Sequence, residues 1–321
     1  MKINRPSYRL LISPDESFLV NVGREVILFT IGDTSLNELK RFNALRNPSF
    51  CALSSNSKMV AYHSTRGHIA VHDIKTGNLL AKSKCLSKEG YGLYFINNDT
   101  QIISSVCQGS VFVLDIESGK VSILNNFPVH HATNIVPIPD NNFIAIGSMP
   151  DEGTLAYGFS IEQDTRTFTD LFSSYPYLLE SVTFIYSGNE ILFFGSPIKN
   201  NSDEWCNGSI LEYFLFSYNL STNIFCSIFK IQDLLGIDGR VHLDYGYFTS
   251  MCLSKSKQYL LIGFSKSIII IDLLNNKHIN TVRAMYVSSL HFVKSDTEVV
   301  IATWERIQFV DFQKLCKMCE S

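Results

Sequence analysis

The chain repeats itself about every forty residues, and this period constrains the fold more than any other feature of the sequence. Each repeat has three short apolar stretches separated by polar turns, followed by a more charged fourth stretch; the clearest copies lie at 50–80 and 92–124. First stretches begin near residues 8, 49, 91, 132, 180, 247 and 287, which divides the chain into seven repeats. A fixed period of this length is typical of solenoids and propellers.

The stretches are rich in β-branched and aromatic residues and are bounded by Gly, Asn, Asp, Ser or Pro, which predicts four strands per repeat and no amphipathic helix of useful length. A four-stranded sheet cannot bury both of its faces alone, whereas radial stacking of such sheets hides both. We therefore predict an all-β fold, a seven-bladed β-propeller with four-stranded antiparallel blades, formed by residues 1–321 as a single domain.

Particular residues of the repeats resemble those of a known family. A Ser13-Pro14-Asp15 turn follows the first strand, and third strands end at Asp73, Asp115, Asp272 and Asp311. In these features the chain resembles the WD-repeat β-propellers, although no repeat carries the Trp-Asp dipeptide. The resemblance implies that the loops before first strands and between second and third strands share one face, which usually binds partners.

The sequence leaves two ways to complete the last repeat. The spacing between Ile74 and Asn78, applied to a third strand that ends at Phe312, places a fourth strand at Cys316–Glu320. Alternatively, Met1–Arg5 completes that sheet.

Two predicted loops are longer than their connections require: Pro197–Ser209 and Ile231–Gly246, both in the fifth repeat. Long loops are often functional, because extra backbone is ordered without core burial to compensate for it.

Acidic residues are concentrated in the same part of the chain. Residues 150–247 hold 13 Asp and Glu against 4 Lys and Arg, a net charge of −9, whereas the remainder has 23 basic and 17 acidic residues. Such a field favours a partner with a basic surface.

Carboxylates beside aromatic side chains suit a protein interface. The candidate partner-binding residues in these loops are Asp151, Glu152, Tyr175, Tyr177, Asp203, Glu204, Trp205, Asp233, Asp238, Asp244 and Tyr245. Trp205 stands out because its neighbours are polar and no strand period calls for a large ring there. Trp304 ends a second strand, so we expect it to pack against its neighbours.

Catalytic, metal and nucleic-acid sites find little support. Cys316 and Cys319 lack a second nearby Cys/His pair, so no metal or other cofactor is predicted. No nucleophile motif of the Gly-x-Ser-x-Gly type occurs. A sequence pI of about 6.2 and the absence of a dense Lys/Arg cluster disfavour direct nucleic-acid binding.

The sequence therefore predicts a non-catalytic protein-interaction module that binds a basic partner protein through an acidic, aromatic loop face. One version is a bacterial immunity protein that neutralises a toxin; a scaffold subunit of a multiprotein complex is the alternative, and a propeller hydrolase with channel carboxylates is a third. The longest apolar run, Ile268–Ile271, is too short to cross a bilayer, so we expect a cytoplasmic protein without membrane contact that is monomeric alone.

Overall fold

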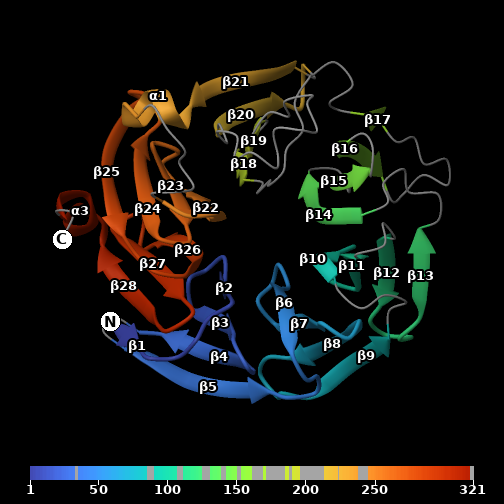
Figure 1. Ribbon diagram of the computed structural model, residues 1–321. Helices are drawn as coiled ribbons and strands as arrows, with labels where there is room; N and C mark the ends of the chain where they lie inside the picture. The colour runs from blue at the N-terminus through green and yellow to red at the C-terminus, as the bar shows by residue number, and fades with distance from the viewer. Residues whose placement is uncertain are drawn as a thin grey trace. The chain divides into compact units, whose positions relative to one another are not determined.

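The fold is described from a computed structural model, shown in Figure 1. It describes residues 1–32, 35–84, 90–106, 111–124, 131–138, 142–149, 153–160, 169–170, 185–187, 190–195, 213–222, 224–237 and 245–318. The chain divides into two compact units. We call Ser7–Ser173 the N-terminal unit, and Met1–Pro6 together with Ser174–Ser321 the C-terminal unit.

The N-terminal unit consists of four-stranded antiparallel sheets, each built from four strands that follow one another in sequence. The first two sheets are β2 (Arg9–Ile12), β3 (Phe18–Val22), β4 (Val26–Ile31) and β5 (Leu36–Phe42), then β6 (Pro48–Leu53), β7 (Met59–Ser64), β8 (His68–Asp73) and β9 (Leu79–Lys84). The next two are β10 (Gly90–Ile96), β11 (Gln101–Val106), β12 (Val111–Asp115) and β13 (Val121–Leu124), then β14 (His131–Ile138), β15 (Asn142–Met149), β16 (Gly153–Ser160) and β17 (Thr169–Asp170).

The described part of the C-terminal unit has the same kind of sheet and two short helices. Its first two sheets are β18 (Ile185–Ser187), β19 (Glu190–Gly195), β20 (Phe214–Asn219) and β21 (Ile224–Lys230), then β22 (Phe248–Leu253), β23 (Tyr259–Phe264), β24 (Ser267–Asp272) and β25 (Lys277–Arg283). The third has the order β1 (Lys2–Ile3), β28 (Ile307–Asp311), β27 (Glu298–Thr303) and β26 (Val287–Val293); the helices are α1 (Ile231–Leu235) and α3 (Phe312–Lys317).

The strand positions confirm the repeat read from the sequence. First strands begin within one residue of the predicted positions in every repeat except the fifth, where β18 begins at Ile185 rather than near 180. The N-terminal alternative for the last repeat is confirmed, because Lys2 pairs with Gln308 and Ile3 with Ile307, so β1 lies beside β28 (Figure 1). The C-terminal alternative is wrong, since the chain after β28 turns into helix α3.

The two helices were not predicted from the sequence, which indicates no amphipathic helix of useful length. Helix α1 occupies the start of the predicted loop Ile231–Gly246, and Ile231 is fully buried in the core there. Gly236 ends this helix in the left-handed conformation, with a φ of 65°. Both helices are a single turn or slightly more, too short to give a readable helical period in the sequence.

Apolar side chains between consecutive sheets form the core of each unit. In the N-terminal unit, Val20 and Leu28 pack with Val60 and Tyr62 of the next sheet. In the C-terminal unit, Leu261 and Ile270 pack with the sheet of β26–β28 and with Leu315 of α3 in one buried cluster. Each sheet therefore uses its neighbour within the unit to cover a face that it cannot bury itself.

The turns of the repeats are closed by short polar side chains. The first turn of a repeat is held by a serine whose hydroxyl accepts a backbone hydrogen bond: Ser13 from Phe18 at 2.9 Å, Ser54 from Met59 at 2.8 Å and Ser254 from Tyr259 at 2.9 Å. Such local bonds to backbone N–H groups favour turns over continued strands. The Ser13 turn that carries part of the family resemblance thus recurs in both units.

The aspartates that end the third strands have an equally local role. The Asp73 carboxylate accepts from Thr76 N at 2.6 Å and that of Asp115 from Ser118 N at 2.8 Å, and these hydrogen bonds hold the pKa of both carboxyls below its usual range. In the last repeat the carboxylate of Asp311 instead accepts from Lys314 N at 2.7 Å and caps α3.

Candidate functional site

Most of the predicted partner-binding residues lie outside the described residues: Asp151, Glu152, Tyr175, Tyr177, Asp203, Glu204, Trp205, Asp238 and Asp244. The other two are in the C-terminal unit. Asp233 is exposed in the first turn of α1, and Tyr245 is half-buried against the core, with its ring centroid 6.3 Å from that of Phe264. Tyr245 thus contributes mainly to packing.

A different part of the C-terminal unit brings loops together. The loops before β22, between β23 and β24, between β25 and β26, and between β27 and β28 are joined by backbone hydrogen bonds. Ser265 N donates to Tyr247 O at 2.8 Å, Tyr286 N to Ser265 O at 2.6 Å, and Trp304 N to Tyr286 O at 3.1 Å. These are the two loop classes that the family resemblance assigns to one face, and here they form one hydrogen-bonded strip.

Large apolar side chains are exposed along this strip. The exposed fraction is 71% for Tyr247, 54% for Met285, 45% for Tyr286 and 56% for Trp304. The rings of Tyr286 and Trp304 stack, with centroids 5.4 Å apart and an interplanar angle of 10°. We call these four residues the aromatic loop surface; aromatic residues and Met are the types enriched in protein interfaces.

Trp304 packs against a neighbour, as expected, but it does so on the surface. Its backbone follows β27 as predicted, but the ring is more than half exposed and its stacking partner, Tyr286, is itself on the surface. Tyr286 also has a φ of 57°, in the left-handed region that a bulky side chain rarely adopts. The Tyr286 ring is thus exposed at a residue whose backbone conformation costs free energy.

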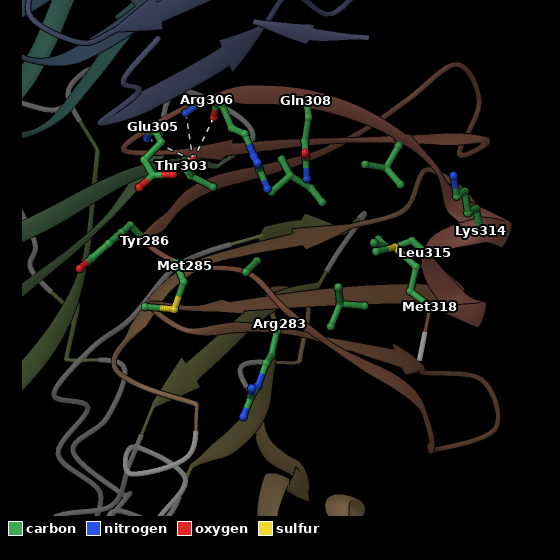
Figure 2. A pocket seen from close by; sticks show the side chains of 14 residues that line it. Arg283, Met285, Tyr286, Thr303, Glu305, Arg306, Gln308, Lys314, Leu315 and Met318 are labelled. Atoms are coloured by element: carbon green, nitrogen blue, oxygen red, sulfur yellow. Dashed lines mark hydrogen bonds between the residues drawn. The ribbon is translucent and has the colours of Figure 1, made fainter. Parts of the chain in front are cut away.

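The turn after Trp304 is fixed by Thr303, whose side chain is 5% exposed. Its hydroxyl accepts from Glu305 N at 3.2 Å and from Arg306 N at 3.1 Å, as Figure 2 shows, and donates to Arg306 O at 3.2 Å. Both backbone groups of Arg306 are held in this way, which orients the residue that follows the turn.

A groove of about 650 Å³ begins at this surface and continues to α3 (Figure 2). Met285 and Tyr286 line one end, and Lys314, Leu315 and Met318 line the other. Between them the groove is bordered by Val282, Ile301 and Val310 from β25, β27 and β28. Its size and mainly apolar lining match those of ligand-binding clefts.

Helix α3, which forms one end of the groove, is fastened to β25. Asn280 Nδ2 donates to Leu315 O at 3.1 Å and to Met318 O at 2.8 Å, so this side chain satisfies carbonyls at the end of the helix. Leu315 is 1% exposed and belongs to the buried cluster shared with β24 and β27. This end of the groove is therefore rigidly attached to the sheets.

The groove is suited to binding rather than to nucleophilic chemistry. Its lining contains no Ser, Cys or His, and Glu305 is its one carboxylate. Elsewhere in the described part of the chain, no group of three or more His, Cys, Asp or Glu side chains is arranged to hold a metal ion. Within that same part, no helix has both the length and the hydropathy needed to cross a membrane.

Two tyrosines of the aromatic loop surface are recognisable from their place in the repeats. Tyr247 and Tyr286 occupy the same place in their repeats, directly before a first strand, where a small turn residue is expected.

Comparison with models of protein families and with curated proteins finds no match for this chain. The class of the protein is therefore argued from its fold and its surface.

Proposed function

We propose that the chain is a seven-bladed β-propeller of the WD-repeat type, with each four-stranded sheet as one blade. The order of strands supports this, because neighbours within a sheet are consecutive strands except where β1 joins β28, and consecutive sheets pack face to face within each unit. The pairing of β1 with β28 adds support, since it joins the two ends of the chain in one sheet and so provides a way to close a ring.

We further propose that this propeller is a non-catalytic module that binds a partner protein through the aromatic loop surface. One observation carries this proposal: Tyr247, Met285, Tyr286 and Trp304 are exposed on loops that are hydrogen-bonded into one strip. Exposing large apolar side chains is unfavourable in water, and Tyr and Trp often provide most of the binding free energy of an interface.

Charge divides the proposed interface into two regions. The net charge of −9 over residues 150–247 supports a basic region on the partner. The described charges beside the aromatic loop surface have the opposite balance: Lys266, Arg283 and Arg306 against Glu305. The partner that we propose therefore has a basic region and a separate apolar region.

The proposal is tested by capturing tagged chain with its cross-linked partners from native cells, identifying the recovered protein, and measuring its affinity for purified variants. Trp304→Ala should weaken the affinity at least about 30-fold, corresponding to about 2 kcal/mol for a central aromatic residue. The control is Leu274→Ala, since Leu274 is 72% exposed in the turn between β24 and β25, away from the aromatic loop surface. Equal affinities of the two variants would contradict the proposal.

A further inference from the structure

The groove between the aromatic loop surface and α3 contains polar groups that no described residue contacts by a hydrogen bond or ion pair. No hydrogen bond or ion pair reaches the Arg306 guanidinium or the Gln308 side-chain amide from any described residue, although Glu305 adjoins Arg306 in sequence. Both side chains are only half-exposed. Solvent reaches both groups, so they are available to a ligand that enters the groove.

Arg306 and Gln308 point the same way because they are two residues apart on an extended chain, which places their Cα atoms about 7 Å apart. Figure 2 shows both side chains projecting into the groove. A guanidinium binds a carboxylate through two parallel hydrogen bonds, and the amide N–H of Gln308 provides a further donor from the same strand. The pair therefore forms a cradle for a carboxylate.

The charges along the groove favour the same ligand. Arg283, Arg306 and Lys314 line it against Glu305 alone, and none of these three cations has an ion-pair partner among the described residues. Apolar side chains of Val282, Ile301 and Leu315 border the space between the cations. A fitting ligand thus combines negative charge with apolar side chains.

We propose that the groove binds an acidic peptide segment in which the side chain of an Asp or Glu contacts Arg306 and Gln308, and a neighbouring apolar side chain packs on Val310 and Met318, which line the groove and are exposed or half-buried. This inference rests on the proposed function, because Met285 and Tyr286 belong to both the groove and the aromatic loop surface. A partner that covers that surface can direct a segment into the groove. The five residues of β28, about 17 Å, set the length of segment that fits.

The experiment is a selection of random seven-residue peptides, displayed without a free C-terminus, on the full chain. The selected peptides should be enriched in Asp or Glu next to Leu, Ile, Val, Met or Phe. Affinity of the best peptide, synthesised with capped ends, is then measured by fluorescence anisotropy. Arg306→Gln should weaken it at least tenfold, whereas Arg66→Gln, an exposed arginine in a β7–β8 loop of the N-terminal unit, should change it less than twofold.

A double-mutant cycle provides the specific readout. Replacing the peptide's acidic residue by its amide should weaken binding to the wild-type chain tenfold and leave binding to Arg306→Gln unchanged, because the contact is already lost. Lys314→Gln, on α3, gives an independent check with a smaller expected loss of two- to threefold. Thermal unfolding of each variant verifies that it is folded.

Selection of peptides without acidic residues, binding that needs a free C-terminal carboxylate, or additive losses in the cycle would each overturn the inference. The proposed function is tested separately, because Trp304→Ala should weaken binding of the captured partner whether or not a segment enters the groove. If Trp304→Ala weakens capture and the peptide cycle is additive, only the groove inference fails. If Trp304→Ala has no effect, the proposed function fails as well.

Discussion

Two loops of this chain share a backbone hydrogen bond and a left-handed residue, and they differ in their side chains. In the N-terminal unit, Thr65 N donates to Asn47 O at 3.0 Å; in the C-terminal unit, Trp304 N donates to Tyr286 O at 3.1 Å. The φ angles of Asn47 and Tyr286 are 52° and 57°. The hydrogen bond and the left-handed residue therefore form with Asn and Thr as well as with Tyr and Trp, so neither needs an aromatic side chain.

The side chains of the C-terminal loop cost free energy, whereas those of the N-terminal loop do not. Asn adopts the left-handed conformation readily, whereas a bulky side chain there is strained by about 1 kcal/mol. Trp304 additionally exposes more than half of its ring, where Thr65 presents a small polar side chain. Since stacking of the two rings offsets only part of this cost, the comparison favours a role for Tyr286 and Trp304 outside folding.

A second difference lies near the ends of the strands that lead into these loops, one residue before each strand ends. His63 of β7 pairs with Phe50, and Ala302 of β27 pairs with Ser289 at the corresponding place. His63 is fully buried, neither ring nitrogen has a hydrogen-bond partner among the described residues, and burial lowers its pKa to about 4. The base of the N-terminal loop is thus sensitive to acid, and that of the C-terminal loop is not.

The largest expected effect on the free energy of unfolding concerns His63. Between pH 7 and pH 5 the unfolded chain binds a proton at this histidine that the folded chain does not, so stability falls as the pH falls, by about 2 kcal/mol. His63→Phe should remove that part of the loss, as measured by urea unfolding at both pH values. Hydrogen exchange should show the amides of β7 opening in acid before those of β27. An equal acid loss in wild type and variant would contradict this role of His63.

A smaller effect on stability is expected when the aromatic pair is introduced into the N-terminal loop. Asn47→Tyr should destabilise the chain by about 1 kcal/mol, because the left-handed conformation is strained for tyrosine. Adding Thr65→Trp should recover about half of this by stacking of the two rings. Asn47→Gly is the matched control and should be neutral within about 0.5 kcal/mol. Thermal unfolding of the variants measures all three, and an Asn47→Tyr variant as stable as wild type would remove the strain argument.

Much of the fold follows from the sequence, because strand period and turn residues are local properties. The Ser13, Ser54 and Ser254 turns and the aspartates at the ends of third strands could be located from the printed residues. The short helix α3 could not, since its formation depends on the Asp311 cap and on Asn280, 35 residues before Leu315. The choice between β1 and a C-terminal strand likewise depends on pairing between distant residues.

The candidate site was harder to predict for a different reason. Trp304 ends a strand, and whether its ring is buried depends on which loop lies beside it, information that only the contact with Tyr286 supplies. The cradle of Arg306 and Gln308 requires α3 and β25 to enclose a groove, so no motif within β28 indicates it. Charge and composition directed the prediction to residues 150–247, of which most candidate side chains lie outside the described residues.

The most direct test replaces the aromatic pair of the C-terminal loop by the residues found in the N-terminal loop, Tyr286→Asn with Trp304→Thr, and measures partner affinity by calorimetry together with thermal unfolding. Because Asn and Thr form the same hydrogen bond and left-handed residue in the N-terminal loop, the double variant should unfold within about 0.5 kcal/mol of the wild-type chain. Its affinity for the captured partner should fall about 100-fold or more. A fully folded double variant that binds the partner as tightly as the wild type would contradict the central claim that these side chains form the interface.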